Sequence, residues 1–187
     1  MTPTDRYDHV SAQFDRLVHA VPADRWDAPS PCAEWTARDV LCHVADTERD
    51  LLDRMGFDPP AVEGLDPITA WTTVRAAMAA ALHDPARVDH AYDGYFGPTT
   101  FARTVDDFYN FDLVVHRWDL ARAVGLREHE VIDHDELARI RHSGEVFGEA
   151  ARAPGIFGAE LPAPDDATEQ ERVLAWMGRD PRATPGG

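Results

Sequence analysis

The sequence contains no lysine, so all 18 of its basic side chains are arginines, set against 34 aspartates and glutamates. The formal net charge is −16. Without lysine, the chain can form neither a Schiff base nor the lysine contact of a P-loop phosphate site. A chain this acidic repels phosphate backbones and anionic lipid headgroups, so we expect no nucleic-acid partner and no membrane partner.

Several other signatures are also missing. Only two cysteines occur, Cys32 and Cys42, which is too few for a disulfide scaffold and favours a reduced, cytoplasmic location. No apolar run approaches the roughly 18 residues of a transmembrane helix, and the first residues do not read as a secretory signal. The glycine-rich nucleotide motifs, the GxSxG elbow and CxxC are absent. Hydrophobic residues still make up 44% of the chain, which is ample for a packed core.

Apolar residues recur at three- and four-residue steps, which predicts an all-α fold built on a four-helix bundle with additional short helices toward the C-terminus. We expect one domain over residues 1–180 and a flexible tail over 181–187. Residues 84–100 are rich in glycine, proline and aromatics, which indicates a long loop or a short hairpin bordering a site. The predicted helices cover residues 5–20, 36–55, 66–83, 102–124, 133–150 and 168–178.

Capping patterns mark where several of these helices begin. Trp35, just before the second helix, is placed to pack on Val40 as a hydrophobic staple. Gly125 is expected to end the fourth helix in a left-handed conformation. Capping boxes are predicted for the pairs Thr36 with Asp39, Asp133 with Glu136, and Thr168 with Glu171.

The first candidate site is the pair Asp112 and His116, which are four residues apart and therefore adjacent on one helix face. Spacing alone is weak evidence, because five of the nine histidines have an acid four residues before them. This pair differs in its apolar setting. A carboxylate buried there without a partner would cost several kcal/mol, roughly, and a divalent metal would remove that cost. A buried Asp–His hydrogen bond is the simpler alternative.

His43 is the second candidate, because it lies among the apolar residues of the second predicted helix. Together, His43, Asp112 and His116 form a set of two imidazoles and one carboxylate, which suits Zn²⁺, Ni²⁺ or Fe²⁺ and leaves coordination positions open. Asp119 could hold an imidazole N–H of the set, or it could pair with Arg117 or Arg122 instead. No base is visible that would activate Cys32 as a nucleophile.

Three stretches resemble the mycothiol-dependent maleylpyruvate isomerase N-terminal-domain family, within the wider group of DinB-like metal-binding proteins. Residues 31–44 read PCAEWTARDVLCHV and residues 112–121 read DLVVHRWDLA, both similar to motifs of that family. Residues 157–181 are similar to the end of a single-domain actinobacterial branch. The resemblance implies a DinB-like four-helix bundle with a divalent metal, most simply zinc, on His43, Asp112 and His116. It also implies mycothiol as a co-substrate.

Two departures from the family pattern limit what the resemblance implies. Asp112 stands where the better-known isomerase has glutamate, so the carboxylate is shorter by one methylene. The isomerase also has a further C-terminal domain that supplies an arginine to its active site. We therefore do not expect maleylpyruvate isomerase activity itself.

Three functions remain open at this point. The first is a metal- and thiol-dependent transferase, isomerase or detoxification enzyme, whose partners are a small-molecule thiol and an electrophilic substrate. The second is a non-catalytic metal-binding, stress-associated module, which could form a homodimer through its helices. The third is a structural bundle in which Asp112 and His116 are only hydrogen-bonded. The sequence names no catalytic residue beyond the three ligands.

Overall fold

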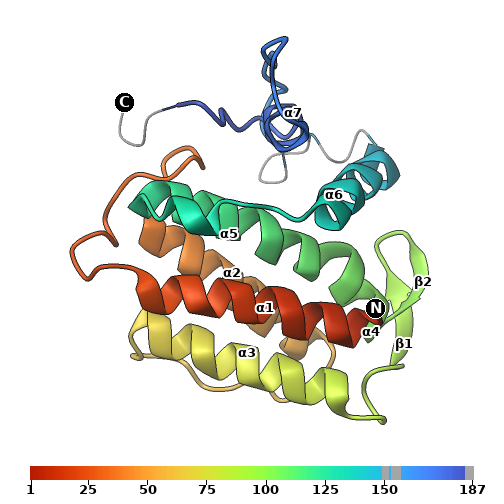
Figure 1. Cartoon of the computed structure of the whole chain (residues 1–187). Helices are drawn as coiled ribbons and strands as arrows, with labels where there is room; N and C mark the ends of the chain where they lie inside the picture. Colours follow the sequence, from red (N-terminus) through yellow and green to blue (C-terminus); the bar gives the residue numbers. More distant parts are fainter. Residues whose placement is uncertain (149–151, 153–156, 184–187) are drawn as a thin grey trace.

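The protein is described here from a computed structural model, which covers residues 1–148, 152 and 157–183. Four long helices form a bundle, in which α1 and α2 each pack against both α3 and α5 (Figure 1). This confirms the predicted DinB-like four-helix bundle. The bundle helices are α1 (Pro3–Ala20), α2 (Ala37–Arg54), α3 (Pro67–His83) and α5 (Asn110–Val124).

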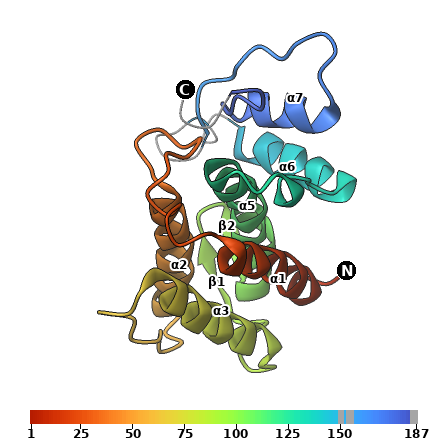
Figure 2. The ribbon, with the colours of Figure 1, turned by 60° about the vertical axis from the view of Figure 1, so that its left-hand side comes forward.

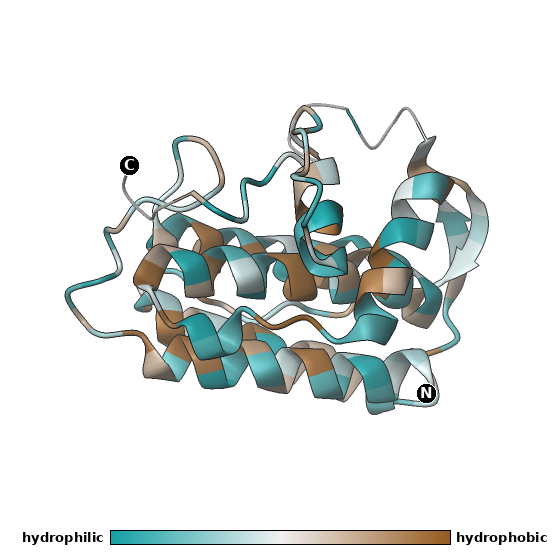
Figure 3. Cartoon of the chain, turned by 45° about the horizontal axis from the view of Figure 1, so that its top comes forward, coloured by the Kyte–Doolittle hydropathy of each residue, from teal (hydrophilic) through white to brown (hydrophobic). Residues whose placement is uncertain are grey.

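Hydrophilic and hydrophobic residues are mixed along the helices (Figure 3), and the apolar ones supply the core. The largest buried side chains come from different helices, for example Tyr7 and Phe14 of α1, Trp71 of α3 and Trp118 of α5. None of the helices within the described residues is both long and apolar enough to cross a membrane.

The start of α2 follows the predicted capping box. The hydroxyl of Thr36 accepts the backbone N–H of Asp39 at 3.2 Å, and the Asp39 carboxylate accepts the N–H of Thr36 at 2.8 Å. Asp66 likewise caps α3, with Pro67 in its first turn. These caps satisfy N–H groups that the helix itself cannot bond, and they fix where each helix enters the bundle.

The predicted uninterrupted helix over 102–124 is wrong in one respect. A short α-helix, α4 (Phe101–Thr104), is followed by a π-helical turn, η1 (Val105–Tyr109), and only then by α5. A π turn inserts extra backbone into a helix and is frequent at functional sites. It directly precedes the turn that carries Asp112. Gly125 ends α5 with a φ of 79°, as predicted.

Residues 84–100 contain a short antiparallel hairpin, which was one of the two predicted forms. Its strands are β1 (Ala91–Gly94) and β2 (Gly97–Thr100), with Gly94 opposite Gly97 at the turn. The exposed turn carries Tyr95 and Phe96. The hairpin leads straight into α4 at one end of the bundle (Figure 1).

Beyond α5, the described residues form a 3-10 turn, η2 (Arg127–His129), and two more helices, α6 (His134–Phe147) and α7 (Glu169–Trp176). Two views place α6 and α7 beyond α5, on the side away from α3 (Figures 1 and 2). The capping box of Thr168 and Glu171 is confirmed.

The other predictions for this C-terminal part have a mixed outcome. The capping box of Asp133 and Glu136 is wrong, because the Glu136 carboxylate is buried against the guanidinium of Arg6 instead. The predicted end of the fifth helix near residue 150, and residues 184–187 of the predicted tail, lie outside the described residues.

Candidate metal centre

The three residues singled out as ligands lie together between α2 and α5. The His43 Nε2 atom is 3.5 Å from one carboxylate oxygen of Asp112, and the His116 Nε2 atom is 3.3 Å from the other. One ligand atom from each residue lies within 4.8 Å of the other two. A single cation could therefore contact all three side chains with small adjustments.

The arrangement follows from the direction of the helices. Asp112 and His116 are one turn apart on α5, so they share a face. Helix α2 runs antiparallel to α5, since Arg54 contacts Tyr109 while His43 contacts Asp112. His116 is 8% exposed, whereas His43 and Asp112 are each 28% exposed. One side of the site is therefore buried and the other is open to solvent.

The charges of the three side chains depend on one another. Burial raises the pKa of Asp112, but the charge of His116 and hydrogen bonds from both histidines outweigh burial and hold it well below its usual range. Burial lowers the pKa of His116, but the Asp112 carboxylate and the hydrogen bond to Asp119 raise it well above its usual range. The carboxylate is thus negative at neutral pH, which a cation requires of its ligand.

Asp119 supports the imidazole of His116 from behind. Its Oδ2 atom lies 2.9 Å from His116 Nδ1, which fixes the ring with Nε2 toward Asp112. The alternative pairings predicted for Asp119 are wrong. Arg117 donates to backbone carbonyls of residues 129 and 131, and Arg122 pairs with Glu130 at 3.3 Å. Asp119 instead binds Arg179, from the segment that follows α7, through two contacts of 2.8 Å.

Two residues of the segment before α2 also reach the site. The ring of Trp35 packs against the rings of His43 and His116, with centroids 4.8 and 5.9 Å away. Cys32 lies 3.3 Å from the Asp119 carboxylate and, with His116 and Asp119, makes a second group able to hold a cation. Both belong to the motif over residues 31–44, which was the only signal in the sequence for either contact.

Glu48 is a buried carboxylate that the sequence analysis did not identify. It lies five residues after His43 on α2, is 1% exposed, and accepts a hydrogen bond of 2.8 Å from the hydroxyl of Tyr7. Burial raises its pKa to about 8, with the Asp112 charge adding to the shift and the Tyr7 bond opposing it. The negative charge of Asp112 therefore affects the pKa of Glu48.

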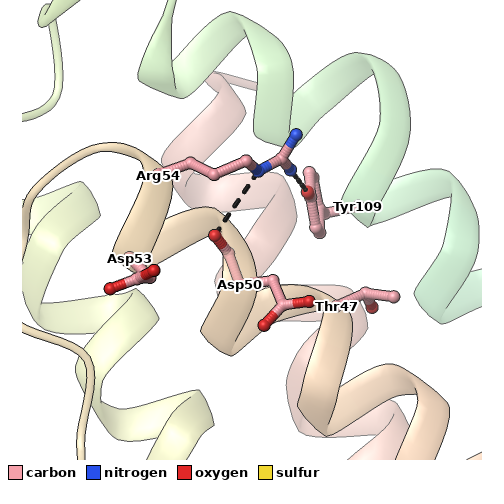
Figure 4. Close-up of a pocket in the computed structure, with 5 residues that line it drawn as sticks. All are labelled: Thr47, Asp50, Asp53, Arg54 and Tyr109. Carbon is pink, nitrogen blue, oxygen red and sulfur yellow. Dashed lines mark hydrogen bonds between the residues drawn. The ribbon is translucent and has the colours of Figure 1, made fainter.

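A separate hollow of about 510 Å³ lies toward the C-terminal end of α2 (Figure 4). It is lined by Thr47, Asp50, Asp53 and Arg54 of α2 and by Tyr109 of the π turn. Arg54 donates to the Tyr109 hydroxyl at 2.6 Å. The lining includes no residue of 84–100, so the segment expected to border a site does not border this hollow.

Comparison with known proteins gives the family. The model of the mycothiol maleylpyruvate isomerase N-terminal domain matches residues 7–121. That range contains Cys32, His43, Asp112, His116 and Asp119, but not the segment after α7.

Two similar sequences come from two strains of Mycobacterium tuberculosis and are named uncharacterized proteins Rv0738 and MT0763. Each is 28% identical to this chain over 193 residues, covering 97% of this chain and all of the relative. No solved structure matches. Since the family model covers more than half of the chain, the protein belongs to the mycothiol maleylpyruvate isomerase N-terminal domain family, whose members have a DinB-like helical fold.

Proposed function

We propose that this protein binds a divalent cation through His43, Asp112 and His116, and that it uses the bound ion in a reaction between a thiol and an electrophile. The observation that carries the proposal is the convergence of two imidazole Nε2 atoms on the two oxygens of one carboxylate. In an apolar bundle, this concentration of ligand atoms has a ready explanation in a cation held between them.

The donor set fits such an ion. Two imidazoles and one carboxylate are common ligands of Zn²⁺, and they also suit Ni²⁺ and Fe²⁺. A bound ion would replace the proton that the raised pKa keeps on the His116 ring, and that proton would pass to solvent. Three protein ligands with one open side are typical of a catalytic rather than a structural zinc site. The partial exposure of His43 and Asp112 supports this interpretation, because a second molecule could reach the centre from that side.

Two neighbouring side chains, those of Asp119 and Trp35, orient and pack against the histidines of the site. Asp119 accepts the Nδ1–H of His116, so that Nε2 faces the centre and can bind an ion once its own proton is released. The indole of Trp35 packs against both imidazoles and covers part of their surface. A divalent cation bound there would lower the pKa of a thiol co-substrate and so supply a thiolate at neutral pH.

Family membership supports mycothiol as the thiol, and the reaction classes that fit are transfer, isomerisation and detoxification. The hollow lined by Thr47, which lies one helical turn after His43, has a volume that could take part of a substrate.

Elemental analysis of the native protein tests the metal site, with H43A and H116A as site variants. H19A is the matched control, because His19 also has an acid four residues before it but is 54% exposed. We expect one divalent ion per chain in the wild type and H19A, and a large loss in both site variants. Equal metal content in all four proteins would refute the assignment.

The thiol reaction is tested by conjugation of mycothiol to a simple electrophile, with and without added metal. We expect turnover only with metal, and only in the wild type and H19A. Bound metal with background rates throughout would favour the non-catalytic metal-binding module. The absence of bound metal would favour a bundle in which the three side chains are only hydrogen-bonded.

A further inference from the structure

Asp119 is the meeting point of three separate parts of the chain. Its side chain is fully buried, and its Oδ2 atom lies 2.9 Å from His116 Nδ1 and 3.3 Å from Cys32 Sγ. Arg179 donates from Nε to Oδ1 and from Nη2 to Oδ2, both at 2.8 Å. The guanidinium thus engages both carboxylate oxygens at once, the strongest geometry for this type of pair.

The backbone after α7 is built to hold Arg179 in this place. The N–H of Gly178 bonds the carbonyl of Ala175, and the N–H of Arg179 bonds the carbonyl of Leu174, each at 2.9 Å. This is the Schellman pattern, and Gly178 has the positive φ, 85°, that it requires. A Cβ atom at Gly178 would also lie 2.6 Å from the Cα of Gly158, so no other residue fits.

His116 is shared between two groups of ligand atoms. Through Nε2 it faces His43 and Asp112, and through Nδ1 it faces Asp119, with Cys32 alongside. The second group includes a cysteine sulfur, which soft and borderline cations such as Zn²⁺ favour. A neutral imidazole has one lone pair, so His116 can bind a cation in only one of the two groups at a time.

Arg179 has the charge and the position to disfavour a cation in the second group. It lies 3.9 Å from Cys32 Sγ, and its two bonds occupy the Asp119 oxygens that a cation in the second group would need. A guanidinium remains protonated at any physiological pH, so its positive charge is permanent and repels a cation there. At the same time its two bonds fix the orientation of the Asp119 carboxylate, whose Oδ2 atom accepts the Nδ1–H of His116.

We propose that Arg179 is a positioning residue that directs the divalent cation to His43, Asp112 and His116 and keeps it away from Cys32, His116 and Asp119. This inference rests on the proposed metal site. It assigns a task to the segment after α7, which lies outside the residues that the family model matches.

Cobalt(II) titration tests the inference, because thiolate ligation of cobalt gives a charge-transfer band in the near ultraviolet that imidazole and carboxylate ligation lack. The proteins compared are the wild type, C32S, R179Q, R179K and the double variant R179Q/C32S. The control is R182Q, because Arg182 lies three residues further on, is 44% exposed and pairs with Glu171 and Asp166.

We expect no thiolate band in the wild type, C32S or R182Q. R179Q should gain the band, with the Cys32 proton released to solvent, and R179Q/C32S should lose it again. Affinity for cobalt at the His43 centre should fall roughly 10- to 100-fold in R179Q, as expected when the partner of a metal-binding histidine is disturbed. R179K keeps the positive charge and should not show the band.

The outcomes separate this inference from the proposed function. Cobalt binding that is the same in the wild type and R179Q, in both affinity and spectrum, would overturn the role of Arg179 alone. A thiolate band in the wild type that C32S removes would overturn it as well. Failure of the wild type to bind cobalt would overturn both proposals. If R179Q does not fold, a thiolate band in the wild type or in R179K would still overturn the inference.

Discussion

Replacing Glu48 by glutamine should change how the stability of the protein depends on pH. Glu48 lies in the core between α1 and α2, where its Oε2 atom accepts the Tyr7 hydroxyl. Among the described residues, its Oε1 atom has no hydrogen-bond partner. A charged carboxylate is costly in such a place, and burial raises the pKa of Glu48 from 4.5 to about 8.

The size of the effect follows from the two pKa values. Between pH 4.5 and about 8, the folded protein keeps a proton on Glu48 that the unfolded chain has released. The free energy of unfolding therefore falls as the pH rises through this range and levels off above it. Since each pKa unit corresponds to about 1.4 kcal/mol, the loss from this one group is roughly 3–5 kcal/mol.

Urea unfolding at a series of pH values from 5 to 9 measures this loss. A chelator should be present, because a cation near Asp112 would favour the charged form of Glu48. E48Q should match the wild type within about 1 kcal/mol at pH 5 and exceed its stability by several kcal/mol at pH 9. E145Q, which removes one exposed carboxylate from α6, controls for the change in net charge.

Two outcomes of the unfolding series with the wild type and E48Q would contradict this prediction. If the stability of the wild type and E48Q runs parallel from pH 5 to 9, then Glu48 does not titrate in this range. The interpretation of its burial would then be wrong. A wild-type stability that rises with pH relative to E48Q would contradict the sign of the effect as well.

Three further substitutions test the fold by urea unfolding. R6M should cost about 3–5 kcal/mol, because it leaves the Glu136 carboxylate buried without its partner; a neutral result would mean that the pair is solvated. G178A should cost more than about 1 kcal/mol, because φ is positive and Gly158 is too close; unchanged stability would contradict the described turn. T36A should cost about 1 kcal/mol through loss of the α2 cap, and no loss would show that the cap is dispensable.

The sequence was sufficient for the local features of the site. The helix start at Thr36 and the one-turn spacing of Asp112 and His116 depend on residues within four positions of each other. The apolar setting of these two residues indicated that their helix face points inward. His43 could be added because α2 has its own apolar face, although the distance between the two helices was not predictable from either.

The contacts that sequence analysis missed join distant parts of the chain. Arg179 and Asp119 are 60 residues apart, and Tyr7 and Glu48 are 41 apart. A charged residue is expected at the surface, and only the packing of another element turns it into a buried partner. The π turn before α5 was also missed, since periodicity over 102–124 fits an α-helix nearly as well.

The most direct test of the metal centre is a crystal structure of the zinc-loaded protein with anomalous diffraction measured at the zinc edge. We expect one ion, about 2.0–2.2 Å from His43 Nε2, His116 Nε2 and an Asp112 oxygen. An ion bound instead through Cys32, or anomalous density located away from all three residues, would contradict it.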